Sequence, residues 1–326
     1  MRGLPGYCTK LFFIDINMKK LPTPTEIHGL FSNGSPDEVW SKASEIIESI
    51  SPAYDFSFVR TVFDDVIRMF RGEYPGYCAI KTSYHDMPHT LDVYLCAVRL
   101  THGVHISGTP LSDNEITLIM IAALMHDIGY AQRHGEDTGT GAQYTRDHVS
   151  RGIEFMRRYL IERHFPSAWS VPLEPMMLST IHTGEFSKIS FPDERVCLLG
   201  KIVATADLVG QMSDRTYLEK LLFLYLEFHE ADLGNYQSML ELLRKTQSFY
   251  EITREKKLDG ELGCLYTKLT YHFMDWFGTE RNYYLESLER NMDYLSQAAR
   301  LDEAECLSML KRGGIVEKIQ AQLASG

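Results

Sequence analysis

Residues 116–129 read ITLIMIAALMHDIG, an apolar run that ends in an adjacent histidine and aspartate. Ser112 or Asp113 can cap a helix just before this run, and the glycine at its end can stop it. The run is too short to span a bilayer, which takes about 18 to 20 apolar residues. We therefore expect a buried helix that reaches about Ile128.

His126 and Asp127 stand together at the end of this apolar run. Burying an aspartate costs several kcal/mol unless the carboxylate is paired or binds a metal. Two neighbours on a helix point about 100° apart, so both can reach one ion only near the helix end. The pair therefore indicates a metal site at the end of a core helix.

Apolar residues recur at helical spacing on both sides of this run, which predicts an all-α fold. Residues 1–36, rich in Pro, Gly and Asn, predict an irregular leader with one short strand at Leu11–Ile16. Residues 37–326 are expected to form one multi-helix domain, with its core over about 55–230 and C-terminal helices over 235–326. The other expected helices are Trp40–Ile50, Phe56–Phe70, Pro88–Leu100, Tyr144–Arg163, Pro175–Ile181, Glu194–Asp207, Arg215–Glu230, Asn235–Lys256, Leu265–Phe277, Arg281–Ala299 and Glu303–Leu323.

Composition limits the class of protein. The 326 residues are 44% apolar and 24% charged, which is typical of a folded soluble chain. The net charge of −11 argues against a nucleic-acid duplex as partner, because phosphate backbones require clustered Lys and Arg. The six cysteines form no C-x-x-C pair, which favours reduced thiols, and the first 20 residues lack a signal-peptide core. We expect a cytoplasmic protein without a membrane partner.

Two more segments carry residues that can bind a metal. Residues 84–93 read YHDMPHTLDV, and the proline suits the first turn of a helix that begins just after His85. Residues 203–211 read VATADLVGQ and place one carboxylate within an apolar helix. Each residue alone is explained as readily by capping or ion pairing, but the set favours a metal. Mixed imidazole and carboxylate ligands suit Mn, Fe, Ni, Zn or Co. The expected ligands are His89, His126, Asp127 and Asp207.

A second metal position would involve two more histidines. His148 lies at the front of the expected Tyr144–Arg163 helix, and His182 stands at the expected end of another helix. With these two residues the site could hold two ions, and Asp127 would bridge them because a carboxylate has two oxygens to share. Magnesium could occupy the second position. Solvent-exposed histidines at helix ends would explain both residues equally well.

At these residues the sequence resembles the HD-domain metal-dependent phosphohydrolase superfamily, over about residues 55–230. YHDMPHTLDV is similar to the YHNxxHxxDV segment of class I cyclic nucleotide phosphodiesterases, with Asp86 in place of the asparagine. This resemblance implies a phosphodiesterase-like helical bundle, with His85 as general acid and His89 as metal ligand. RDHVSRGIEFMRRYL resembles the HxxxG helix of bacterial HD proteins, which implies His148 and His182 as ligands of a second ion.

The resemblance implies a phosphodiesterase that cleaves cyclic nucleotides or related nucleotides through a metal-bound hydroxide. The expected catalytic residues are His85 and Asp127, and the expected cofactor is one or two divalent transition metal ions. Further substrate contacts are expected from Tyr84, Tyr130, Arg133 and Gln211, with Lys81, Arg146 and Arg151 as other candidates for phosphate. An HD-type di-iron oxygenase and a non-catalytic ligand sensor are the alternatives, and a homodimer is left open.

Overall fold

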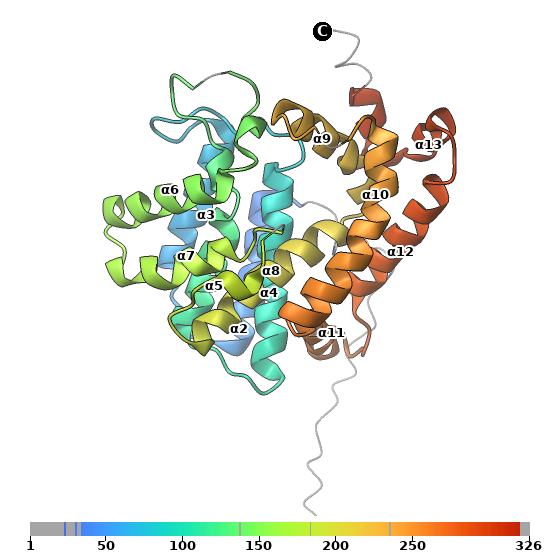
Figure 1. Ribbon diagram of the computed structural model, residues 1–326. Coiled ribbons are helices and arrows are strands. Elements are labelled where there is room, and N and C mark those ends of the chain that lie inside the picture. The colour runs from blue at the N-terminus through green and yellow to red at the C-terminus, as the bar shows by residue number, and fades with distance from the viewer. Residues whose placement is uncertain are drawn as a thin grey trace, which may run out of the picture.

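The computed structural model describes residues Thr23, Leu30, 34–136, 138–182, 184–234 and 236–319, and over these residues the fold is all-α (Figure 1). They contain no β-strand and only one isolated bridge, between Tyr77 and Arg133. The expected strand at Leu11–Ile16 lies outside the described residues. The helices are α2 (Pro36–Ile50), α3 (Ser57–Arg71), α4 (Met87–Ile106), α5 (Asp113–Met125), α6 (His148–Glu162), α7 (Ser170–Leu178), α8 (Glu194–Ser213), α9 (Tyr217–Glu230), α10 (Met239–Ile252), α11 (Leu269–Phe277), α12 (Tyr283–Ala298) and α13 (Glu303–Met309).

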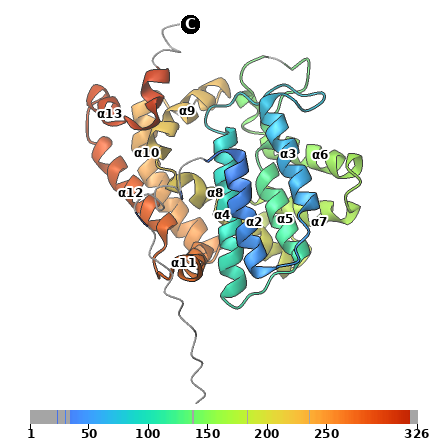
Figure 2. The ribbon, with the colours of Figure 1, turned by 180° about the vertical axis from the view of Figure 1, so that it is seen from behind.

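The two ribbon views agree on the arrangement of these helices. Helices α4 and α8 lie side by side in the middle of the molecule, with α2, α3 and α5–α7 on one side and α9–α13 on the other (Figures 1 and 2). Arg99 of α4 joins the central pair to the second side through a 2.7 Å hydrogen bond to the Tyr284 hydroxyl of α12, and α4 also packs against α2 and α5 of the first side. The central pair therefore contacts both halves of the fold.

Helices α4, α5 and α8 are apolar almost all round, because neighbouring helices cover every face. Helix α8 is the one described helix that is long and apolar enough to cross a membrane, but 78% of its apolar window is buried inside the fold. That burial is consistent with a core helix of a soluble protein. Polar side chains on their buried turns, such as His89 of α4 and Asp207 of α8, are therefore held in the interior.

Local sequence explains where several helices begin and end. Ser112 and Glu115 form a reciprocal capping box at the start of α5. The Asp86 side chain accepts a hydrogen bond from the His89 amide and so begins α4, with Pro88 in its first turn. The helix thus begins just after His85, as the sequence predicts.

Some predicted ends are wrong. Helix α5 stops at Met125 and not near Ile128, because the chain tightens there into the 3₁₀ turn Ile128–Tyr130. Helix α8 continues past Asp207 to Ser213, and a nine-residue π-helix, Thr253–Glu261, follows α10. The expected final helix, Glu303–Leu323, is interrupted: α13 ends at Met309, where Leu310 leaves the helical conformation, and the chain is helical again over residues 315–319. Between these two segments Gly313 and Gly314 have positive φ angles of 69° and 61°.

Candidate metal centre

Three buried side chains meet where α4 begins and α5 ends. The Nε2 atoms of His89 and His126 lie 3.2 Å apart, and Oδ2 of Asp127 lies 3.2 Å and 3.1 Å from them. Metal–nitrogen bonds of about 2.0–2.1 Å put adjacent ligand atoms about 3.0–3.4 Å apart. The spacing of these three atoms therefore fits one shared ion.

Oδ2 of Asp127 gives an independent test of that fit. The atom is buried, yet it accepts no hydrogen bond of normal geometry from the described part of the chain. A buried carboxylate oxygen without a hydrogen bond is costly, and a metal ion would satisfy it. The residues present therefore suit a divalent ion of the transition-metal type.

Asp207 of α8 completes this inner group. Its Oδ1 lies 3.7 Å from Nε2 of both His89 and His126, and its carboxyl side chain is only 4% exposed. The structure thus brings together the residues that the sequence proposed as the first ligand set, from three helices. We call them the inner group: His89, His126, Asp127 and Asp207.

Two further histidines lie close to the remaining carboxylate oxygens of Asp127 and Asp207. Nε2 of His148 lies 3.4 Å from Oδ1 of Asp127, and Nε2 of His182 lies 3.2 Å from Oδ2 of Asp207. Asp127 thus faces histidines with both oxygens, the arrangement expected of a carboxylate that bridges two ions. His148 and His182 are called the outer pair below.

The ring orientation of two ligands is set by backbone carbonyls. Nδ1 of His126 lies 2.8 Å from the Ala123 carbonyl oxygen, and Nδ1 of His148 lies 2.8 Å from that of Thr145. A ring whose Nδ1–H donates to a carbonyl keeps the lone pair of Nε2 for a metal. Both Nε2 atoms are therefore oriented for ligation.

His85 stands beside the centre, paired to a carboxylate. Its Nδ1 lies 2.6 Å from Oε2 of Glu227, and the other Glu227 oxygen accepts a 2.6 Å hydrogen bond from the Tyr84 amide. Burial works to lower the pKa of His85, but Glu227 and Asp127 outweigh it and the pKa is raised. His85 is thus a proton-carrying residue with a fixed ring.

The Tyr130 ring packs against two of the histidine rings. Its ring stacks on His85 and on His148, with centroids 4.6 Å apart in both cases, while the two imidazoles lie 6.2 Å apart. Stacked rings are about 3.5 Å apart, so rings on opposite faces would be separated by about 7 Å or more. Both imidazoles therefore lie against the same face of Tyr130, which is itself fully buried.

The carboxylates dominate the electrostatics of the centre. Burial disfavours the charged form of His126, but Asp127 and Asp207 raise its pKa to about 9. Burial also works to raise the pKa of Asp127, yet the charges of His126 and His85 hold it well below the usual value. Against the same effect of burial, His182 and His126 lower the pKa of Asp207 as well, so both carboxylates stay ionised, which favours a bound cation.

The other proposed substrate contacts have different surroundings. The Tyr84 hydroxyl donates to Oε1 of Gln211 at 2.7 Å, and the Gln211 amide nitrogen lies 3.3 Å from Nε2 of His182 and 3.4 Å from Oδ1 of Asp207. Gln211 thus contacts His182 and Asp207 directly, and Tyr84 contacts them through Gln211. Arg133 pairs at 2.9 Å with Glu154 at the surface, and no described contact brings it to the centre.

The remaining cationic candidates also have protein partners. Arg151 donates to the carbonyls of Gly129 and Ala131 and lies over the Tyr144 ring. Arg146 donates to a backbone carbonyl at Asp232, and Lys81 is exposed. Arg151 therefore supports the turn that follows Asp127.

Sequence reasoning missed Glu227, the partner of His85. Its only local signal is an acid in the leucine-rich segment YLEKLLFLYLEF of α9, which also contains Glu219. Both acids are buried, Glu219 at 0% and Glu227 at 4% exposure, so burial alone does not indicate which of them faces His85. Only the contact of α9 with Tyr84 and His85, just before α4, shows this role.

A model of the family described as Npun_R2479-like matches residues 135–271. The match covers less than half of the chain and includes the outer pair, Asp207 and Glu227, but not His85, His89 or the His126–Asp127 pair. Neither the curated proteins nor the solved structures contain a match to this sequence.

Proposed function

We propose that this protein is a cytoplasmic, metal-dependent phosphohydrolase of the HD-domain type that acts as a phosphodiesterase on cyclic or related nucleotides. The observation that carries the proposal is the meeting of His89, His126 and Asp127 around one point, with Oδ2 of Asp127 buried and without a hydrogen bond. The motif resemblance of residues 84–93 supports the reaction class.

The ligands of the first ion would be the inner group, and Asp127 would share its second oxygen with an ion bound to His148. Divalent ions in such a site lower the pKa of bound water and polarise the oxygens of a phosphoryl group. His182, facing Asp207, would complete the outer position. Tyr84 and Gln211 would hold Asp207 and His182 in place through the hydrogen bonds described above.

His85 would donate a proton to the leaving oxygen. Glu227 holds Nδ1 of His85, so Nε2 remains to face the substrate. Tyr130 fixes the plane of the ring. A positioned histidine with this kind of carboxylate partner can act as a general acid near neutral pH.

The test is metal analysis of the purified chain, followed by hydrolysis of bis-p-nitrophenyl phosphate and a panel of cyclic nucleotides with added Mn²⁺, Mg²⁺, Ni²⁺ or Fe²⁺. Metal-dependent turnover that disappears in His126→Ala is the expected result. The matched control is His229→Ala, because His229 is exposed on α9 and its side chain lies outside the centre.

Two outcomes would replace the proposal. A chain that carries two irons, consumes dioxygen and hydrolyses none of these phosphodiesters would be an oxygenase. A chain that binds metal and nucleotide but turns over no substrate would be a sensor.

A further inference from the structure

His182 differs from the other outer histidine in how it is held. His148 begins α6 and its ring is tied to a backbone carbonyl, whereas His182 lies between α7 and the next helical turn, and its side chain is 28% exposed. Nδ1 of His182 has no hydrogen bond within the described ranges of the chain. Its Nε2 lies 3.2 Å from Oδ2 of Asp207 and 3.3 Å from the Gln211 amide nitrogen, and the rest of its placement comes from what holds the surrounding backbone.

That backbone is held by a lysine from the other half of the fold. Nζ of Lys257 donates to the carbonyl oxygens of Ile181, at 3.2 Å, and Gly184, at 2.8 Å. These two residues flank His182 on either side. One ammonium group thus bridges both sides of the turn that presents the ligand.

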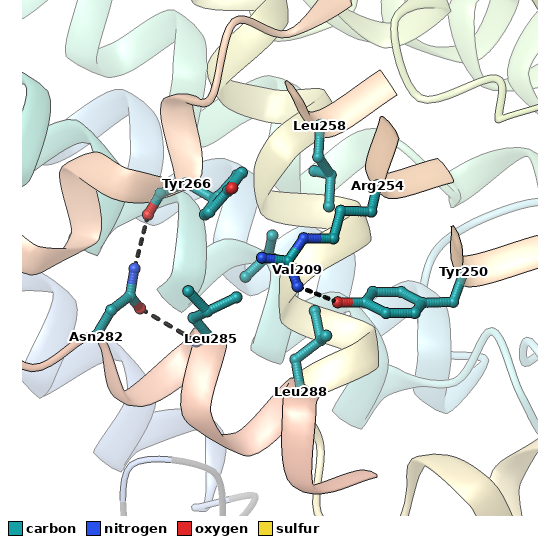
Figure 3. A pocket seen from close by; sticks show the side chains of 8 residues that line it. All are labelled: Val209, Tyr250, Arg254, Leu258, Tyr266, Asn282, Leu285 and Leu288. Atoms are coloured by element: carbon teal, nitrogen blue, oxygen red, sulfur yellow. Dashed lines mark hydrogen bonds between the residues drawn. The ribbon is translucent and has the colours of Figure 1, made fainter. Parts of the chain in front are cut away.

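Lys257 reaches this position from the π-helix Thr253–Glu261. The wider turns of a π-helix shift the side chains relative to a continuous α-helix, and such segments are frequent at functional sites. Figure 3 shows Arg254 and Leu258 of this segment facing Val209 of α8 and Leu285 and Leu288 of α12 around a small pocket. The π-helix therefore packs against α8 as well as against the segment that carries His182.

Burial lowers the pKa of Lys257, so keeping its ammonium group half-buried has a free-energy cost. Its two hydrogen bonds to carbonyl oxygens offset part of that cost. Lys256, the preceding residue, is exposed and has no described side-chain contact. The two adjacent lysines thus form a matched pair, one holding the His182 turn and one in solvent.

We propose that Lys257 is a positioning residue that fixes His182 as a ligand, so that the second metal position depends on the π-helix of the C-terminal half. This inference rests on the proposed two-metal centre. It predicts that removing the ammonium group weakens the outer position and leaves the inner group unchanged.

The experiment is titration of the full-length, metal-free chain with Mn²⁺ and with Zn²⁺, measuring stoichiometry and both affinities. Lys257→Met is expected to weaken the second affinity about 10- to 100-fold, as supports of metal ligands typically do. The first affinity should change by less than about twofold, and Lys257→Arg should recover much of the loss. Lys256→Met is the control and should behave as the unaltered chain.

A double-mutant cycle between Lys257 and His182 provides a second measurement. If Lys257 acts through His182, the variant that combines Lys257→Met with His182→Ala should lose no more affinity than His182→Ala alone. Thermal unfolding of each metal-free variant checks that the fold is retained. A general loss of structure would instead weaken both metal positions and would not be restored by arginine.

The outcomes separate the two proposals. If the unaltered chain binds no metal, the metal centre itself is wrong. If it binds one ion, or binds two with an affinity that Lys257→Met leaves unchanged, the role of Lys257 is wrong and the inner centre stands.

Discussion

His126 and His182 approach the same centre in different ways. The side chain of His126 is 1% exposed, closes a core helix and has its ring tied to the Ala123 carbonyl. The side chain of His182 is 28% exposed, lies between helices and depends on backbone contacts supplied by Lys257. The inner group thus lies within the hydrophobic core, whereas the outer pair lies at the edge of the core.

This difference indicates an order of metal binding. Ligands fixed by core packing need little rearrangement to bind an ion, and the side-chain entropy cost has already been met on folding. Ligands at the edge must be ordered when the ion arrives. We therefore expect a tight inner position and a weaker outer one.

The largest expected effect tests that order directly. Asp207→Asn removes a charge from the inner group, and we expect metal affinity to fall by more than about 100-fold with loss of turnover. His148→Asn should weaken only the second ion, by about 10- to 100-fold. Metal titration measures both. Asp293→Asn, at an exposed position of α12, is the control, and equal losses in the two variants would contradict the inner and outer distinction.

A second prediction separates proton transfer from metal binding. His85→Gln should leave metal content unchanged but lower kcat for a cyclic nucleotide by about 10²- to 10⁴-fold, because the leaving alkoxide needs a proton. Glu227→Gln should cost about 10- to 100-fold. Bis-p-nitrophenyl phosphate has a better leaving group, so its losses should be smaller. Equal losses for both substrates would mean that His85 is not the acid.

A third prediction concerns the close contact that places His148. A Cβ atom at Gly129 would lie 1.8 Å from the His148 carbonyl oxygen, so Gly129→Ala must push α6 away from the turn after Asp127. We expect a loss of about 1–3 kcal/mol of unfolding free energy and a weaker second ion. Urea unfolding and metal titration measure these effects. Gly234→Ala, where a Cβ meets no atom within 4 Å, should change neither.

The smallest expected effect lies at the far end of α5. Burial works to raise the pKa of Glu115, but hydrogen bonds from Arg195 and Ser112 lower it to about 2, from 4.5. A lowered folded-state pKa stabilises the protein above pH 4.5, and this contribution is lost as the pH falls toward 2. Glu115→Gln should therefore cost about 1 kcal/mol at pH 7, and the difference should shrink between pH 4.5 and 2.

Urea unfolding of the metal-free chain at several pH values checks this prediction. Metal affinity should not change in the Glu115 variant, since the residue is at the opposite end of α5 from His126. A cost that grew as the pH fell would contradict the sign of the pKa shift.

By itself, the sequence determined the all-α fold and named the side chains that we propose as metal ligands. Helical periodicity and capping are local properties, so they predict the start of α4 after His85 and the apolar helix before His126. The metal itself is a proposal, made because a buried carboxylate beside a histidine is costly without a partner. The ends of α5 and α13 could not be predicted as well, because local turns decide them: a 3₁₀ turn follows α5, and Leu310 leaves the helical conformation after α13.

Only the tertiary structure decided how the centre is supported. Glu227 lies 142 residues from His85 along the chain, and Lys257 lies 76 residues from Ile181. Many acids and lysines on surface helices have the same local pattern, so periodicity cannot tell which ones face a ligand. Packing of α9 beside Tyr84 and His85, and of the π-helix beside α8, brings these charges into contact because buried polar groups must find partners.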